Sequence, residues 1–196
     1  MIVKFSLLIV PNKNGGFGIE FHLVDCSFYM DFKKLTTKYN PELMKNVSLK
    51  LIKFNKHNAI NGSFTFAENI RDFQFINQVD SRKRNGKRWL VYNVTINGCQ
   101  ILENTLGKSN PIFDVLMNEV RKSIKNLPRR CPLKKDTEIS LLNLYYNEEM
   151  FPPYLPSGTF DTFLMLTSKK KMMLQIETIT YVEARNSESH RRRKLE

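Results

Sequence analysis

The chain has 196 residues, enough for one domain that buries roughly 70% of its unfolded surface without metals or dense crosslinking. Hydrophobic residues make up 41% of it, with 14 Phe and 7 Tyr against 8 Gly, which excludes a disordered or collagen-like chain. No apolar run approaches the ~20 residues of a membrane-spanning helix. The formal net charge of +12 is gathered in short clusters at 81–88, 129–135, 168–171 and 190–194.

Residues 1–16 open with an apolar run, Phe5 to Val10, that has the character of a signal peptide. The run is short, and no small-x-small cleavage site follows it. Two interpretations stay open for this segment: a short or defective signal sequence, or a leading β-strand. We expect 17–184 to form the folded domain and 185–196 to form a disordered basic tail.

Strand-like patterns follow in chain order, separated by turn residues. They cover 17–32 around Cys26, 47–54, 61–69, 71–79, 89–100, 136–146, 158–167 and 171–184. The residues 55–62 are expected as the turn between the second and third of these strands. Asn85-Gly86 is a strong signal for a tight hairpin before the fifth.

The segment 89–100, WLVYNVTINGCQ, combines alternation, a glycosylation motif and a cysteine. Period-two alternation predicts a half-buried strand with one face made of Leu90, Tyr92, Val94 and Ile96. Asn93 and Thr95 then share the outer face, where a glycan meets no obstacle. Two further Asn-x-Ser motifs begin at Asn46 and Asn61.

The period changes at Asn110, which is a good N-cap for a helix that starts at Pro111. Apolar residues recur at helical spacing from there until Pro128 stops the pattern: Phe113, Leu116, Met117, Val120, Ile124 and Leu127. Seven or eight short strands with one amphipathic helix predict an all-β fold, an antiparallel β-sandwich.

Catalysis and metal binding are not favoured by the residue pattern. The three histidines, His22, His57 and His190, have no partner at metal-ligand spacing, and no nucleophile elbow is present. The glycine-rich 14–18 lacks the lysine of a phosphate-binding loop. We therefore expect no enzyme activity, no metal and no cofactor.

The three cysteines are Cys26, Cys99 and Cys131. Cys99 ends a predicted strand and Cys131 follows the predicted helix, so a Cys99–Cys131 bridge would staple the helix to the sandwich. In a reducing compartment, the alternative is three buried thiols that act as small hydrophobic groups.

Four blocks carry a resemblance to a known family: 49–66, 91–102, 110–133 and 151–166. They resemble an insect-expanded family of secreted proteins of unknown function, which includes fly chemosensory proteins of the B type and is similar to the ML (lipid-recognition) superfamily. The resemblance extends over 20–184. It implies an immunoglobulin-like, ML-like β-sandwich that is secreted and carries a hydrophobic small molecule, such as a lipid or a cuticular-hydrocarbon pheromone. It supplies no catalytic residues.

The side chains expected to line such a ligand follow from the alternation alone. They are Phe64, Phe66, Phe73, Phe75, Tyr92, Val94, Ile96, Phe113, Leu116, Val120, Phe160, Leu164 and Leu166. The alternative is a protein-interaction module with a filled core, whose basic hairpin tips dock an acidic receptor, a glycosaminoglycan or a membrane surface. Nucleic-acid binding is not favoured, because the basic residues are not interleaved with aromatic ones on an evident platform.

Overall fold

The computed structural model describes residues 4–11, 17–24, 28–83, 85–103, 105, 111–151 and 155–184, the first two ranges by their backbone alone. The strands are β1 Lys4–Pro11, β2 Phe17–Val24, β3 Phe28–Tyr39, β4 Met44–Phe54, β5 His57–Phe66, β6 Gln74–Arg82, β7 Arg88–Asn97, β8 Ile124–Lys125, β9 Glu138–Leu144, β10 Gly158–Ser168 and β11 Lys171–Ala184. The helices are α1 Gly98–Glu103, α2 Pro111–Ser123 and the short 3-10 helix η1 Glu148–Met150.

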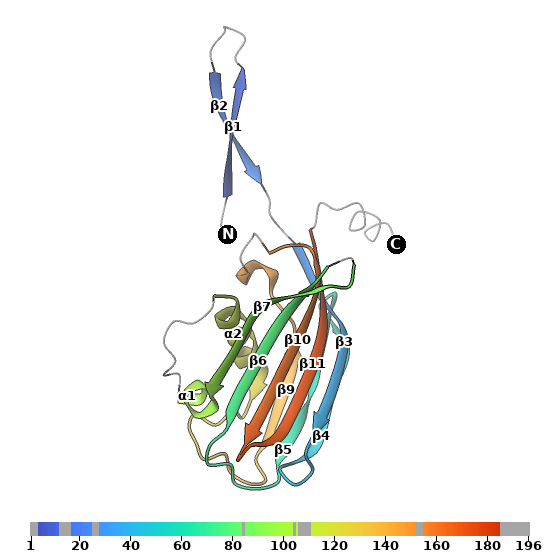
Figure 1. Ribbon diagram of the computed structural model, residues 1–196, viewed down its shortest axis with the longest axis vertical. Coiled ribbons are helices and arrows are strands. Elements are labelled where there is room, and N and C mark those ends of the chain that lie inside the picture. Colours follow the sequence, from blue (N-terminus) through green and yellow to red (C-terminus); the bar gives the residue numbers. More distant parts are fainter. Residues whose placement is uncertain are drawn as a thin grey trace.

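Two antiparallel sheets pack face to face (Figure 1). One has five strands in the order β3-β11-β10-β6-β7, and the other has four in the order β4-β5-β9-β8. The helices α1 and α2 lie along the β7 side of the sandwich. The predicted all-β sandwich is therefore confirmed.

The segment 17–32 is not the single strand that its pattern predicted. Its first part, β2, pairs with β1 in a separate two-stranded sheet, whereas β3 pairs with β11 in the sandwich. In Figure 1 the β1–β2 hairpin stands apart from the two packed sheets. Cys26, between β2 and β3, lies outside the described residues.

The turn between β4 and β5 is much shorter than the predicted 55–62. Asn55 and Lys56 both have positive φ angles, of 46° and 68°, which is the geometry of a two-residue hairpin turn. His57 already pairs with Phe54, so β5 begins there. Gly62, expected in the turn, lies inside β5 at φ 149°, where a Cβ atom would collide with the backbone of Ser48.

A β-bulge in β7 changes the predicted face of Leu90. Val79 pairs with Tyr92 but the next residue, Asp80, pairs with Leu90, which leaves Val91 as an extra residue in β7. The phase of the alternation reverses at that point, so Val91 packs on the core and Leu90 is 61% exposed. The prediction that Leu90 shares the inner face with Tyr92 is wrong for this reason.

The helix is shorter than predicted and has a neighbour. α2 starts at Pro111 as expected, but it ends at Ser123, because Ile124 pairs with Leu141 of β9 and begins β8. Strand pairing therefore overrides the helical spacing that had included Ile124 and Leu127. The predicted N-cap, Asn110, lies outside the described residues. The end of the predicted strand 89–100 is helical, because α1 begins at Gly98.

The core between the sheets is divided into three clusters. The first cluster lies between the five-stranded sheet and α2, and it contains Phe28, Met30, Phe75, Val79, Tyr92, Ile101, Phe113, Leu116, Met117, Phe151, Phe160 and Val182. The second cluster is built around Met44, Phe66, Phe73 and Met173, and the third around Phe32, Ile60, Leu141 and Leu144.

Candidate functional site

The predicted lining residues lie in the interior, but they divide between the clusters. Nine belong to the first cluster or pack against it: Phe75, Tyr92, Val94, Ile96, Phe113, Leu116, Phe160, Leu164 and Leu166. Phe66 and Phe73 belong to the second cluster, Phe64 packs against it, and Val120 packs on the third; Leu166 packs against the second cluster as well as the first. Most of the predicted lining residues therefore lie in or beside one cluster, next to α2, and the others lie in or beside the remaining two clusters.

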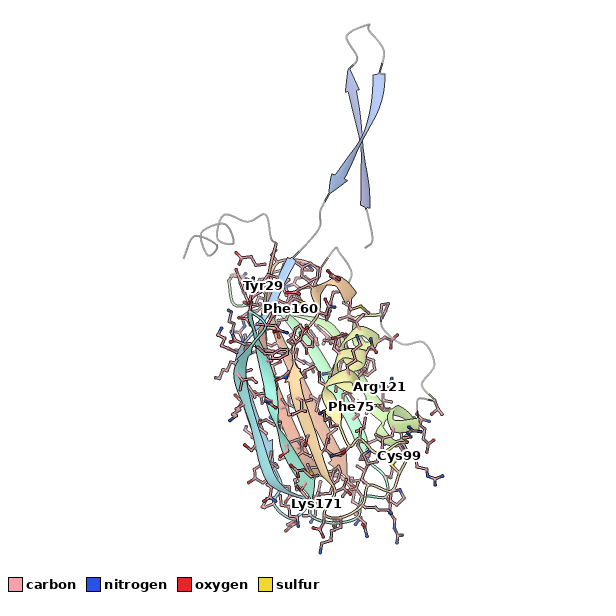
Figure 2. All side chains as sticks on the ribbon, turned by 180° about the vertical axis from the view of Figure 1, so that it is seen from behind. Tyr29, Phe75, Cys99, Arg121, Phe160 and Lys171 are labelled. Carbon is pink, nitrogen blue, oxygen red and sulfur yellow. A yellow bond between two sulfur atoms is a disulfide. The ribbon has the colours of Figure 1, made fainter. Side chains whose placement is uncertain are left out.

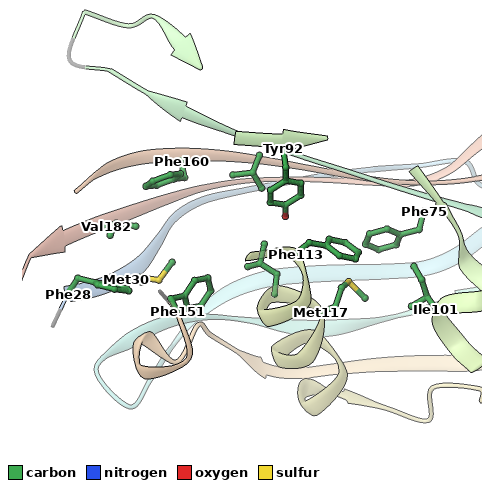
Figure 3. Packing of buried hydrophobic residues seen from close by; sticks show 12 residues of the cluster. Phe28, Met30, Phe75, Tyr92, Ile101, Phe113, Met117, Phe151, Phe160 and Val182 are labelled. Atoms are coloured by element: carbon green, nitrogen blue, oxygen red, sulfur yellow. The ribbon is translucent and has the colours of Figure 1, made fainter. Parts of the chain in front are cut away.

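The first cluster is built from two facing walls. Phe113 of α2 lies 1% exposed, with its ring centroid 6.1 Å from the ring of Phe75 and 6.1 Å from that of Tyr92. Figure 3 shows Phe113 and Met117 directed from α2 toward these two rings on the facing sheet. Edge-on aromatic contacts of this kind stabilise the packing by about 0.5–1.5 kcal/mol each beyond the buried area.

Sequence reasoning missed several members of this wall. Phe28, Met30 and Val182 come from strand ends, and Phe151 comes from the loop after η1. The sequence pattern does not indicate that Phe151 is buried, because this residue stands at the start of a proline-rich loop, where apolar residues do not recur at strand or helix spacing. The ring of Tyr146 lies 5.6 Å from that of Phe151 and extends the aromatic lining toward the third cluster.

The first cluster contains one buried polar pair. The Tyr92 hydroxyl donates to Oδ1 of Asn77 at 2.6 Å, and Nδ2 of Asn77 donates to the carbonyl oxygen of Phe163 at 3.0 Å. Burial, and secondarily the neighbouring Tyr146, raises the pKa of Tyr92 well above its ordinary value. Burial alone raises the pKa of Tyr146 in the same direction. Both phenols are therefore neutral donors throughout the physiological pH range.

Threonine hydroxyls line the middle of the same inner face. Thr178 and Thr180 alternate along β11 with the inward-facing Val182, and they are 6% and 2% exposed. Thr178 pairs with Thr162 of β10, which lies between the inward-facing Phe160 and Leu164. Among the described residues, the hydroxyls of Thr37, Thr178 and Thr180 have no hydrogen-bond partner. A buried unpaired hydroxyl costs about 1–3 kcal/mol, so these groups favour an occupant that can pair with them.

A hollow of about 580 Å³ lies on the outer face of the five-stranded sheet. Its floor carries an ion-pair network: Asp161 accepts two hydrogen bonds from Arg82, at 2.6 and 3.1 Å, and lies 3.2 Å from Nε of Arg88. Lys34 of β3 and Glu177 of β11 also line this hollow. The side chains of opposite sign largely neutralise one another, so this hollow has no strong preference for one ligand charge.

His57 is the one histidine whose side chain is described, and its ring is packed between other side chains. Its ring stacks between Tyr29 and Tyr145, with centroid distances of 5.1 and 5.2 Å. Its Nδ1 lies 3.1 Å from the carbonyl oxygen of Met30 and 3.7 Å from Glu148. In the described part of the chain, no group of three His, Cys, Asp or Glu side chains is arranged to hold a metal ion.

The predicted disulfide is present. Cys99 at the start of α1 is bonded to Cys131, and both pack against the second cluster. The bridge thus links the end of β7 to the loop after β8, and Figure 2 shows Cys99 at the edge of the sandwich. Of the three glycosylation motifs, Asn46 and Asn93 are exposed and Asn61 is half-buried.

The fold and this interior define the class of protein: a disulfide-linked antiparallel β-sandwich with an aromatic core closed on one side by a helix. Residues 75–162 match a family model described as a protein of unknown function (DUF1091). The match runs from β6 to the start of β10, and so includes α1, α2 and the disulfide, but it covers less than half of the chain. No curated protein matches the sequence. Within the described ranges, no helix is long and apolar enough to cross a membrane.

Proposed function

We propose that the protein is a non-enzymatic binder and carrier of a hydrophobic ligand, held between the five-stranded sheet and α2. The observation that carries this proposal is the inner face of the five-stranded sheet, where the aromatic side chains of the first cluster share a face with buried threonine hydroxyls that have no hydrogen-bond partner among the described residues. Sites for small apolar ligands combine these two features, since the lining supplies affinity and a few polar groups fix orientation.

Entry of the ligand requires α2 to move. The helix α2 is not itself paired with a strand of either sheet, but it continues directly into β8, so its N-terminal part can shift while the pairing of β8 with β9 stays in place. Its contacts with the first cluster are those of side chains, chiefly Phe113, Leu116 and Met117. Burial of roughly eight to ten methylenes at ~0.8 kcal/mol each supplies about 6–8 kcal/mol, which supports affinity near the micromolar range. Association costs reduce this figure and are offset by the polar contacts.

The proposal extends to a secreted, glycosylated protein, in keeping with the likeness to insect chemosensory and ML-type proteins. The disulfide supports this, because disulfides persist in oxidising compartments. The exposed Asn46 and Asn93 support it as well, because a glycan at either position leaves the core undisturbed. A lipid or a cuticular-hydrocarbon pheromone is the ligand class that we propose.

Native mass spectrometry of the full chain secreted from insect cells, before and after organic extraction, tests the proposal. We expect an extractable apolar mass bound to the folded protein. Val94→Phe adds volume beside the first cluster and should reduce the bound fraction, whereas Val47→Phe makes the same change beside the second cluster and should not. Circular dichroism of both variants checks folding.

Two results would contradict the proposal. One is a protein that carries no extractable mass and takes up no long-chain alcohol or alkane in a direct titration. The other is an equal loss of ligand in Val94→Phe and Val47→Phe, which would place the ligand elsewhere.

A further inference from the structure

The tip of the β6–β7 hairpin, residues 82–90, exposes large apolar side chains next to basic ones. Trp89 is 52% exposed and Leu90 61% exposed, although the next two residues of the same strand, Val91 and Tyr92, pack in the first cluster. The backbone N–H of Lys83 donates to the carbonyl oxygen of Lys87 at 2.9 Å, which joins the two strands at the tip. Two large exposed apolar side chains next to lysines at one hairpin tip make this tip a candidate interaction site.

Two lysines of the tip lie beside the indole, whereas Arg82 and Arg88 pair with Asp161. Nζ of Lys83 lies 4.2 Å from the centroid of the Trp89 ring, and Nζ of Lys87 lies 5.7 Å from it. Among the described residues, neither lysine forms an ion pair with a carboxylate. Their positive charge is therefore available to an anionic partner.

The other basic hairpin tip, Ser168–Lys171, differs in both respects. Lys169 pairs with Glu68 at 3.3 Å and Lys171 with Glu42 at 2.9 Å, so two of its charges are compensated within the chain. It lies at the opposite end of the sandwich, as the position of Lys171 relative to Phe160 shows in Figure 2. The two tips are thus not equivalent, and only the β6–β7 tip combines free charge with an exposed indole.

The register decides which kind of partner fits. Trp89 pairs with Ser81 and Leu90 with Asp80, so the two apolar side chains point to opposite faces of the hairpin. A single flat partner surface covers one face and leaves the other in water. A lipid headgroup layer surrounds the tip and covers both, and the indole is the side chain best suited to that layer.

We propose that the β6–β7 tip docks the protein on an anionic lipid membrane. Trp89 and Leu90 enter the headgroup region from the two faces of the hairpin, and Lys83 and Lys87 contact lipid phosphates. A polysaccharide offers charge but no apolar medium for Leu90, and an acidic protein offers a surface on one side only. The proposal is independent of any ligand in the first cluster.

The chain provides its own probe, because Trp89 is the only tryptophan. The full-length protein is titrated with vesicles of phosphatidylcholine alone and of phosphatidylcholine mixed with phosphatidylserine, at low and high salt. We expect a blue shift of the indole emission and protection from iodide quenching, with the phosphatidylserine vesicles only and weaker at high salt.

Two pairs of variants separate the tip from general charge and hydrophobicity. Lys83→Gln/Lys87→Gln should lower the partition coefficient about thirty-fold, whereas Lys169→Gln/Lys170→Gln removes the same charge at the other tip and should have little effect. Leu90→Ser should weaken binding, and Met150→Ser, which is 44% exposed outside the tip, serves as its control.

Three results would overturn the proposal. An indole emission that does not change while the protein cosediments with vesicles would place the contact elsewhere. Equal losses in the two lysine pairs would show a diffuse charge effect. Binding to heparin without binding to vesicles, unaffected by Leu90→Ser, would identify a polysaccharide as the partner.

Discussion

Replacing Tyr92 with Phe tests how far the polar pair inside the first cluster is shielded from water. The substitution keeps the ring and its contact with Phe113, and it removes only the hydroxyl that donates to Asn77. Asn77 is 4% exposed, so its Oδ1 atom then has no donor and no direct access to water.

The loss is that of a buried hydrogen bond together with the desolvation of the acceptor that remains, about 1–3 kcal/mol of unfolding free energy. For a chain of this length, a 2 kcal/mol loss lowers the thermal midpoint by roughly 4–8 °C. Tyr29→Phe is the matched control, because its hydroxyl donates to the carbonyl oxygen of Lys56 in an exposed position. We expect the control to change stability by less than ~0.5 kcal/mol.

Chemical denaturation of the wild type, Tyr92→Phe, Asn77→Ala and the double variant measures the effect and the coupling between the two residues. We expect a coupling of at least ~0.5 kcal/mol, as for residues in direct contact. A Tyr92→Phe protein as stable as the Tyr29→Phe control would refute the reasoning, because it would mean that water replaces the lost donor. The interior would then be hydrated, and its polar groups would not select a ligand.

Three further predictions follow from the described contacts. Replacing both Cys99 and Cys131 with alanine should lower the unfolding free energy by about 3–4 kcal/mol, because the bridge closes a separation of 32 residues and so restricts the unfolded chain. Urea denaturation measures this loss, and a loss below ~1 kcal/mol would contradict the loop-closure explanation. Because burial raises the pKa of Tyr92 and Tyr146, both phenols stay protonated in the folded state at a pH where the unfolded phenols ionise, near pH ~10. The contribution of the two phenols to stability is therefore full below that pH, and the unfolding free energy should fall above it by about 1.4 kcal/mol per pH unit for each tyrosine. Alkaline denaturation curves measure this slope, and Tyr92→Phe/Tyr146→Phe should abolish it. Gly98→Ala should destabilise the protein by about 1–3 kcal/mol, because the added Cβ atom meets the buried Phe73 ring. Gly86→Ala should destabilise it by only about 1 kcal/mol, because the added Cβ atom meets no neighbour and the cost comes from the φ angle of 80° alone. Equal midpoints of the two variants in thermal denaturation would contradict this contrast.

The features predicted well are those that depend on local sequence alone. The strand 171–184 has the bounds that its pattern indicated, and the Asn85-Gly86 turn joins β6 to β7 as expected. Alternation placed Phe75 and Phe160 on inner faces, because a regular strand repeats every two residues. In these elements the spacing of apolar residues along the sequence is enough to predict the buried face, and tertiary contacts do not change it.

The features predicted poorly depend on partners that a linear pattern does not contain. Ile124 has the spacing of a helical residue, but the free edge of β9 recruits it into β8. The division of the phenylalanines between clusters also depends on packing, since Phe73 and Phe75 share one face by alternation yet belong to different clusters. Alternation does not single out the inward threonines of β11, because their hydroxyls become informative only once the fold buries them without a hydrogen-bond partner among the described residues.

The bulge at Val91 connects the two proposed sites. Without the extra residue, Leu90 would continue the inner face of Tyr92, and Trp89 would lie on the outer face. With it, Val91 completes the wall of the first cluster while Leu90 turns outward. Phe160 and Tyr92 lie at the same end of the sandwich as the tip, since Arg82 pairs with Thr159 at the start of β10. A protein docked through this tip would therefore hold the first cluster close to the lipid surface, where the path of an acyl chain into the interior is shortest.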